Sequence, residues 1–100
     1  MAWMIVSEDS EQAAALRADR TIMDAHWQYE LSIRHRILAA GSLRSDDGRT
    51  PNGSLLIVEA ASRDEAMALI LADPATKAGL RGSITIRYWN PAILAHDEVS

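Results

Sequence analysis

The run that decides the fold lies at residues 54–59 and has the sequence Ser54-Leu55-Leu56-Ile57-Val58-Glu59. Consecutive side chains of a strand point to opposite faces of a sheet, so four apolar residues in a row make both faces apolar. A sheet with one face in water shows an alternating pattern instead. We therefore expect a strand that is covered on both sides, by helices on one face and by another layer on the other.

Three further segments lie N-terminal to this strand. Residues 2–6 are short, apolar and rich in strand-forming residues, which indicates a first strand. Helix-favouring sequence follows from residue 11 to about residue 34, with a break near residues 19–21. Residues 36–41 are strand-like again, and Asp-Gly, Pro and Asn-Gly turn signals then predict a loop before the strand at 54–59.

A second helix and a last strand lie C-terminal to residues 54–59. Ser62 and Glu65 form the capping-box pattern that opens a helix, and the helix ends before Asp73 because a proline follows that residue. Residues 83–89 alternate with period two, as a strand with two different faces does. The chain therefore has the element order βαββαβ.

This order predicts an α+β domain of the ferredoxin-like βαββαβ kind, with both helices on one face of a four-stranded antiparallel sheet. With 100 residues, 48% of them apolar, the chain supports one core; we assign it to residues 1–92 and treat residues 93–100 as a short C-terminal tail. The second sheet face would be an exposed apolar patch, so we expect a homodimer formed through the sheet faces. The alternative is that the tail folds over this face.

Composition argues against several classes of partner and cofactor. The formal net charge is −4, so the chain lacks the basic surface that binds nucleic acid or anionic membranes, and no apolar run approaches the ~20 residues of a membrane span. With no cysteine, we expect neither disulfides nor thiolate metal sites, and a cytoplasmic location. His26, His35 and His96 lack metal-ligand spacing and no glycine-rich phosphate loop is present, so we expect no metal and no cofactor.

The first helical segment carries the best candidate for chemistry. At about 100° per residue, one stripe of this helix contains Ile22, Ala25, His26, Tyr29 and Ile33, which we expect to face the sheet, with His26 as its only ionisable group. His26 is then either a core histidine or an imidazole in a partly apolar cleft that exchanges protons near neutral pH. Tyr29 either fills the core or orients a substrate oxygen.

Asp73 and Arg44 are the other polar candidates. Asp73 and the proline after it suit the first positions of a short helix that runs to Lys77 and ends at Gly79. The same carboxylate is also suited to orient His26 and to stabilise the imidazolium form. Arg44 belongs to a charged loop that either closes a pocket or is only solvated.

Six segments, in this order and spacing, resemble the YciI-like (YCII-related) family across roughly residues 2 to 92. They are His26-Trp27-Gln28-Tyr29, Arg36-Ile37-Leu38-Ala39-Ala40-Gly41, Gly53-Ser54-Leu55-Leu56-Ile57-Val58-Glu59, Asp73-Pro74, Ala78-Gly79-Leu80 and Tyr88-Trp89-Asn90. The resemblance implies a dimeric α+β barrel, in which two ferredoxin-like copies join through their sheets.

The resemblance also implies a chemistry. A His–Asp pair has been proposed as the active site of this family, and one member resembles a dehydrochlorinase of hydroxylated aromatics. Position by position, the pair corresponds to His26 and Asp73, which we take as the catalytic candidates. Tyr29, Ser42 and Arg44 are the substrate-binding candidates, although Ser42 stands where the family usually has a proline.

Three functions compete at this point. The first is a cofactor-independent enzyme of lyase or isomerase type, in which His26 shuttles a proton on a small polar or aromatic substrate. The second is a non-catalytic dimeric module that binds a small molecule or a partner protein. The third is a cofactorless oxygenase, a class that shares this fold. His35 stands where many relatives carry an aspartate, and if that aspartate is the family's acid, the pair is broken here.

Overall fold

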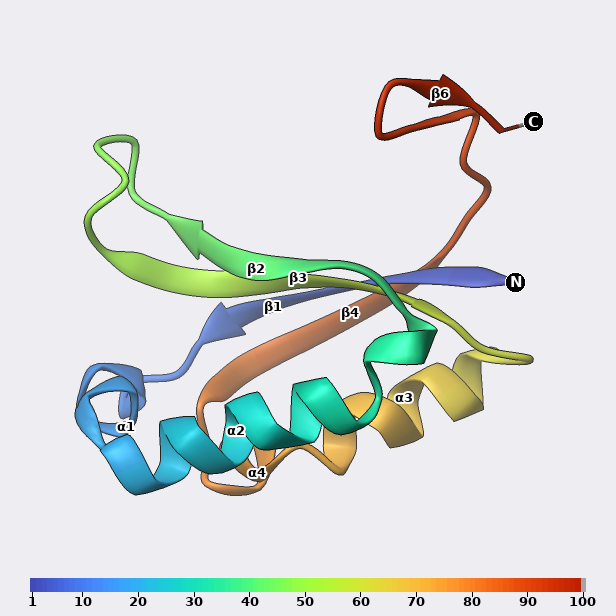
Figure 1. The fold of residues 1–100 in the computed structure, drawn as a ribbon. Coiled ribbons are helices and arrows are strands. Elements are labelled where there is room, and N and C mark those ends of the chain that lie inside the picture. The colour runs from blue at the N-terminus through green and yellow to red at the C-terminus, as the bar shows by residue number, and fades with distance from the viewer. Residues whose placement is uncertain (100) are drawn as a thin grey trace.

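The structure is a computed structural model that describes residues 1–99, so Ser100 of the predicted tail lies outside the described residues. Figure 1 shows one sheet with all the α-helices on the same side. The elements are β1 (Ala2–Asp9), α1 (Ala13–Ala18), α2 (Arg20–Ser32), the 3-10 turn η1 (Arg34–Arg36), β2 (Ile37–Arg44), β3 (Pro51–Glu59), α3 (Arg63–Leu71), α4 (Pro74–Lys77), β4 (Arg81–Trp89), β5 (Ile93–Leu94) and β6 (Asp97–Glu98).

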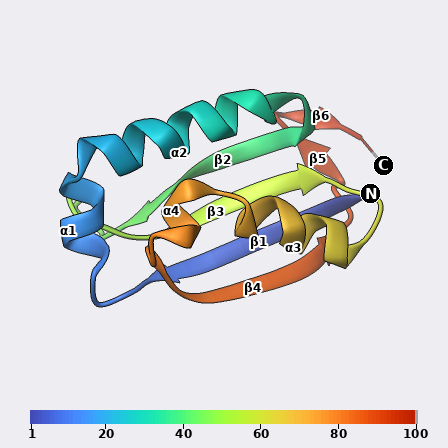
Figure 2. The ribbon, with the colours of Figure 1, turned by 90° about the horizontal axis from the view of Figure 1, so that it is seen from below.

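The sheet has the strand order β2-β3-β1-β4, and every neighbouring pair is antiparallel. Seen from the helical side, α2 runs beside β2 while α3 crosses over the opposite half of the sheet (Figure 2). The predicted α+β ferredoxin-like fold is confirmed. The predicted break in the first helix lies at Asp19, whose side chain accepts a hydrogen bond from the backbone N–H of Ile22 and so caps α2.

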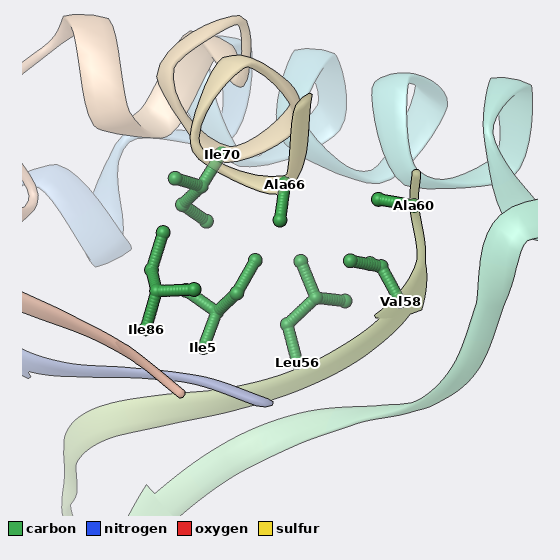
Figure 3. Close-up of a cluster of buried hydrophobic side chains, with 7 residues drawn as sticks. All are labelled: Ile5, Leu56, Val58, Ala60, Ala66, Ile70 and Ile86. Atoms are coloured by element: carbon green, nitrogen blue, oxygen red, sulfur yellow. The ribbon is translucent and has the colours of Figure 1, made fainter. Parts of the chain in front are cut away.

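The core lies between the sheet and α3. Cross-strand pairing sets Ile5 opposite both Leu56 and Ile86, and these side chains point towards Ala66 and Ile70 of α3 (Figure 3). Ser62 caps α3 by accepting from the N–H of Glu65, as the capping-box pattern predicts. The carboxylate of Glu65 accepts from the N–H of Ala61 instead of Ser62, which is one residue further back than expected.

The opposite face of the sheet is apolar along β1 and β3, while β4 contributes the polar residues Thr85 and Arg87 to it. Met4 pairs with Ile57 and Val6 with Leu55, so the second apolar row of β3 meets the second row of β1. All the helices lie on the other side (Figure 1). Within residues 1–99 this face therefore has no helix packed on it.

The predicted tail forms a small hairpin, β5–β6, beyond the end of β4 (Figure 1). Its two-residue turn has positive φ angles at Ala95 (51°) and His96 (75°), the backbone shape that joins twisted antiparallel strands. Ile93 is 67% exposed, and Leu94 reaches only one corner of the apolar face, near Ala2. The hairpin leaves most of that face open.

Two expectations about the sheet differ from the structure. β2 and β3 are longer than predicted: Arg44 ends β2 opposite Pro51, so it belongs to a strand and the loop shrinks to residues 45–50. The Ser45 N–H donates to the Thr50 carbonyl and the Thr50 N–H donates to the Ser45 hydroxyl. These bonds close the loop and allow strand pairing to continue further than the turn signals indicated. In the described part of the chain, no helix is long and apolar enough to cross a membrane.

Candidate functional site

The inward face of α2 is centred on His26. Ile22, Tyr29 and Ile33 lie on it as predicted, and all are partly buried. The prediction for Ala25 was wrong, because that residue lies about 100° from His26 around the helix and is exposed. The prediction that His26 is the only ionisable group on this face was also wrong, because Glu30, one turn further on, is partly buried beside it.

His26 and Asp73 are in direct contact. His26 Nδ1 lies 2.9 Å from Oδ1 and 2.8 Å from Oδ2 of Asp73. Asp73 also caps α4, since its Oδ1 accepts from the N–H of Ala75 at 2.9 Å, and the residue is only 2% exposed. The two interpretations of Asp73, helix cap and histidine partner, are therefore both true of the same carboxylate.

Arg81 completes the support of Asp73, and the sequence did not single it out. Its Nη2 donates to Asp73 Oδ2 at 2.9 Å, and its Nη1 donates to the hydroxyls of Ser7 and Ser54. Nε donates to Thr76 at 2.7 Å, and the side chain is only 5% exposed. A signal was present in the sequence, because Ser7 and Ser54 end the inward apolar rows of β1 and β3 with two facing hydroxyls, and buried hydroxyls need a polar partner.

The second ring nitrogen of His26 faces another carboxylate. Nε2 lies 2.9 Å from Oε1 of Glu30, so the imidazole sits between Asp73 and Glu30. The hydrogen bond to Asp73 and then that to Glu30 raise the pKa of His26 to about 9, against the opposing effect of burial. Burial raises the pKa of Asp73, but His26, the Ala75 N–H and Arg81 outweigh it and leave that pKa below its ordinary value. At neutral pH the site thus holds an imidazolium between two carboxylates.

Tyr29 lies one turn from His26, but its phenol is already engaged. The hydroxyl donates to the backbone carbonyl of Leu69 at 2.6 Å, which ties α2 to α3. Burial raises the pKa of Tyr29, so the group stays protonated at neutral pH. Because its proton is used in this bond, the Tyr29 hydroxyl can accept a hydrogen bond from a ligand but cannot donate one.

Ser42 and Arg44 lie across the site on β2. Nε of Arg44 donates to Ser42 Oγ at 2.8 Å and Nη1 donates to the carbonyl of Gly48 at 3.3 Å. Both side chains are exposed to solvent. His35 lies in η1 and is exposed, away from the contact between His26 and Asp73.

One cavity of about 430 Å3 joins these groups, between α2 and the β2–β3 edge of the sheet. Its wall contains all five residues that the sequence put forward, His26, Tyr29, Ser42, Arg44 and Asp73. Polar residues on the wall that the sequence did not put forward are Arg17, Glu30, Ser54 and Arg81. The remainder of the wall comes from Met23, Trp27, Ile33, Gly41, Leu55, Leu56, Leu69, Ile70 and Leu80. The volume and the mixed lining suit one small ligand with both apolar and polar parts.

Within residues 1–99, no cluster of three or more histidine, cysteine, aspartate or glutamate side chains is placed to hold a metal ion. The cavity wall supplies an imidazolium, carboxylates, guanidinium groups and hydroxyls. These groups can exchange protons with a ligand and can balance charge on it.

Comparison with known proteins agrees with the geometry. Residues 1–90 match the model of the YCII-related domain family. The chain belongs to the YCII-related family. This confirms the resemblance drawn from the sequence, and the family match spans β1 to β4 with both layers of the fold. No curated protein sequence matches the chain.

Two solved structures are similar to this YCII-related protein. One is 5-chloro-2-hydroxyhydroquinone dehydrochlorinase (TftG) from Burkholderia phenoliruptrix AC1100 in complex with 2,5-dihydroxybenzoquinone. It has 29% sequence identity and a TM-score of 0.75, over 90% of this chain and 94% of that one. The other is protein Atu4242 from Agrobacterium tumefaciens, with 16% identity and a TM-score of 0.52 over 92% and 94% of the two chains, a likeness that concerns the fold alone.

Proposed function

We propose that this protein is a cofactor-independent enzyme of lyase or isomerase type, in which His26 moves a proton on a small hydroxylated ring. The observation that carries the proposal is the contact of 2.8 Å between His26 Nδ1 and the buried carboxylate of Asp73 at the wall of a cavity. A histidine that is oriented by a buried carboxylate and exposed to a ligand is the usual arrangement for general acid–base catalysis.

In this proposal Asp73 fixes the imidazole and His26 performs the proton transfer. Asp73 is itself held by the N–H of Ala75 and by Arg81, so the ring cannot rotate without losing a buried ion pair. Nδ1 is thereby committed to Asp73, which leaves Nε2, now in contact with Glu30, as the nitrogen for a ligand. Because the pKa of His26 is raised to about 9, the resting form is the imidazolium, which stabilises an enolate or phenolate oxygen and can donate a proton to it.

The proposed substrate class follows from the wall of the cavity and from the similar enzyme. Apolar side chains of the sheet and α3 suit a ring, while His26 and Arg44 suit its oxygen substituents. TftG is a dehydrochlorinase of a chlorinated hydroxyhydroquinone, and its structure holds a dihydroxybenzoquinone. Elimination of chloride from a ring whose hydroxyl is already ionised needs a proton delivered to the carbon that bears chlorine and a second hydroxyl proton removed as chloride leaves. The imidazolium of His26 can donate the first proton and, as the neutral imidazole, accept the second.

Chloride release from 5-chloro-2-hydroxyhydroquinone tests the proposal. We expect release above the spontaneous rate with the wild-type protein and a loss of at least a hundredfold in His26→Gln, because general acid–base catalysis contributes about that much or more. Asp24→Asn, an equal-sized change at an exposed position of the same helix, is the control and should retain the rate. Tight binding of the ring without turnover would instead support the alternative function, a non-catalytic binding module.

We also propose that the protein is a homodimer joined through the open faces of its two sheets, in the manner of a dimeric α+β barrel. The support is the partly buried apolar row of Met4, Val6 and Leu55, on which no helix of the described chain packs; Ile57 of the same row is already buried within the protomer. The cytoplasm is the compartment we expect, because a chain without cysteine gains nothing from an oxidising environment.

A further inference from the structure

The two carboxylates that flank His26 differ in how firmly they are held. Asp73 is 3% exposed and is bound by His26, Ala75 and Arg81. Glu30 is 21% exposed, projects from a solvent-facing helix, and within residues 1–99 its carboxylate is paired with His26 alone. Yet Glu30 occupies Nε2, the ring nitrogen on which the proposed chemistry depends. As the structure stands, a ligand oxygen has no free imidazole nitrogen to bind.

We propose that Glu30 is a movable counter-ion, which holds Nε2 of His26 in the ligand-free protein and yields it to an anionic oxygen of the ligand. The inference rests on the proposed function, because it assigns the ligand of the same cavity to a narrower class. The ligands of this narrower class are ring compounds with a hydroxyl group that is ionised at neutral pH.

The charges around His26 favour an anion over a neutral ligand. Asp73 faces the imidazolium from the start of α4 but is shared with Arg81 of β4, and Arg17 of α1 is paired with Asp9. Arg44 of β2 lines the cavity, and within residues 1–99 its guanidinium bonds to Ser42 and to the Gly48 carbonyl, while Tyr29 of α2 is uncharged. Removing Glu30 without replacing its charge would leave cations in excess in a partly buried site. An anionic ligand restores the balance.

The carboxylate of Glu30 has a place to go. A second cavity of about 320 Å3 opens on the other side of Glu30, between α2 and β2, and Trp27 and Gly41 line both cavities. Arg34, four residues after Glu30, lies on the wall of this second cavity. Arg34 is the first residue of η1, just past the end of α2, and Glu30 and Arg34 both line this cavity, so their opposite charges face the same space. Glu30 can therefore exchange His26 for Arg34 by a rotation of its own side chain.

Two measurements on four proteins test the exchange. The proteins are the wild type, Glu30→Gln, Arg34→Gln and the exposed control Asp24→Asn. Nitrogen-15 NMR titration gives the pKa of His26, and calorimetry gives the affinity for two probes. 2,5-Dihydroxybenzoquinone has hydroxyls that ionise below neutral pH, and 2,5-dimethoxybenzoquinone has the same ring with no ionisable group.

We expect Glu30→Gln to lower the pKa of His26 and to raise the affinity for the dihydroxy probe about fivefold, which is the upper range for one partly exposed ion pair. Affinity for the dimethoxy probe should not change. Arg34→Gln should leave the pKa of His26 as it is and weaken binding of the dihydroxy probe, because the displaced carboxylate then lacks its new partner. Asp24→Asn should alter neither quantity.

Three results would overturn the inference. An unchanged pKa of His26 in Glu30→Gln means that Glu30 does not hold Nε2. A lowered pKa with equal or weaker binding of the dihydroxy probe means that Glu30 stays in place when a ligand binds. If no protein binds either probe, the proposed substrate class is wrong, and formate then serves as a minimal anion: failure of Glu30→Gln to bind formate more tightly than the wild type overturns the exchange itself.

Discussion

Asp73 connects the fold to the site at the level of a single residue. Its carboxylate caps α4, holds Nδ1 of His26 and neutralises the buried guanidinium of Arg81. A buried acid that satisfies three donors is both a structural and a functional residue, since the same bonds that stabilise it also fix its direction. Loss of the negative charge of Asp73 should therefore lower the stability of the fold, so the stability of such a variant is measured before its activity is interpreted.

Asp73→Asn should destabilise the protein by about 3 kcal/mol, because the amide leaves Arg81 buried without a counter-ion. Urea unfolding followed by circular dichroism measures the change. Asp24→Asn, which removes an exposed charge, should shift the free energy of unfolding by no more than about 0.5 kcal/mol. Equal stability of the two variants would mean that Arg81 finds solvent in place of Asp73, contrary to its 5% exposure.

His26 should make stability depend on pH above neutrality. Its pKa rises from 6.5 to about 9 on folding, so the stabilisation is complete below pH 6.5 and is lost as the pH rises through 9. Melting temperatures measured across this interval should fall more steeply for the wild type than for His26→Gln. Parallel curves for the two proteins would show that His26 does not gain its proton affinity from the folded site.

The sequence predicted part of this arrangement for clear reasons. Helical periodicity placed His26 and Tyr29 on the inward face of α2, and the Asp-Pro pair marked Asp73 as the start of a helix. It missed Glu30 because a charged residue at the edge of an inward stripe is normally assigned to solvent. It missed Arg81 because a residue at the end of a strand shows its burial only when the facing strands are known.

At the level of elements, α3 matters because it covers the core and carries the carbonyl of Leu69 that holds Tyr29. Its N-terminus depends on Ser62, whose hydroxyl accepts from the N–H of Glu65 at 3.1 Å. Turn signals and capping patterns located α3 and α4 well, since these depend on local sequence. They placed the end of β2 too early, because the pairing of Arg44 with Pro51 depends on the partner strand.

Ser62→Ala should destabilise the protein by about 1 kcal/mol, the usual cost of losing an N-cap hydrogen bond. Ser62→Asp retains an acceptor at the cap and should stay within a few tenths of the wild type. Chemical denaturation of the three proteins gives the comparison. A loss of the same size in both variants would assign the effect to the hydroxyl of Ser62 in some other contact.

At the scale of the whole molecule, the second face of the sheet is the surface on which no helix of residues 1–99 packs. Because residues 55–58 of β3 are all apolar, the sequence did not show which of its two rows faces the helices. In the structure, Leu56 and Val58 face the helices, while Leu55 and Ile57 point to the other face. A dimer through this face would bury the second row, and because Leu55 of that row also lines the cavity under α2, the proposed interface and the cavity adjoin at this residue. The division into a domain of residues 1–92 and a tail stays a prediction.

Leu55→Asp should separate the proposed dimer while leaving the protomer folded, because a charge on the open face opposes contact with a second copy. Leu56→Asp should instead unfold the chain, since it places the charge in the core. Light scattering at micromolar concentration should give twice the 11.0 kDa protomer mass for the wild type and the protomer mass for Leu55→Asp. A wild-type mass of one protomer would end the dimer proposal.

The most direct test of the account compares ligand binding by the wild type and by His26→Gln, with melting temperature measured on the same samples at pH 7. We predict that the wild type binds 2,5-dihydroxybenzoquinone and that His26→Gln, still folded, binds it at least tenfold more weakly, because the imidazolium supplies the main charge contact in the cavity. Equal affinity of the two folded proteins would contradict the account and make His26 a structural partner of Asp73.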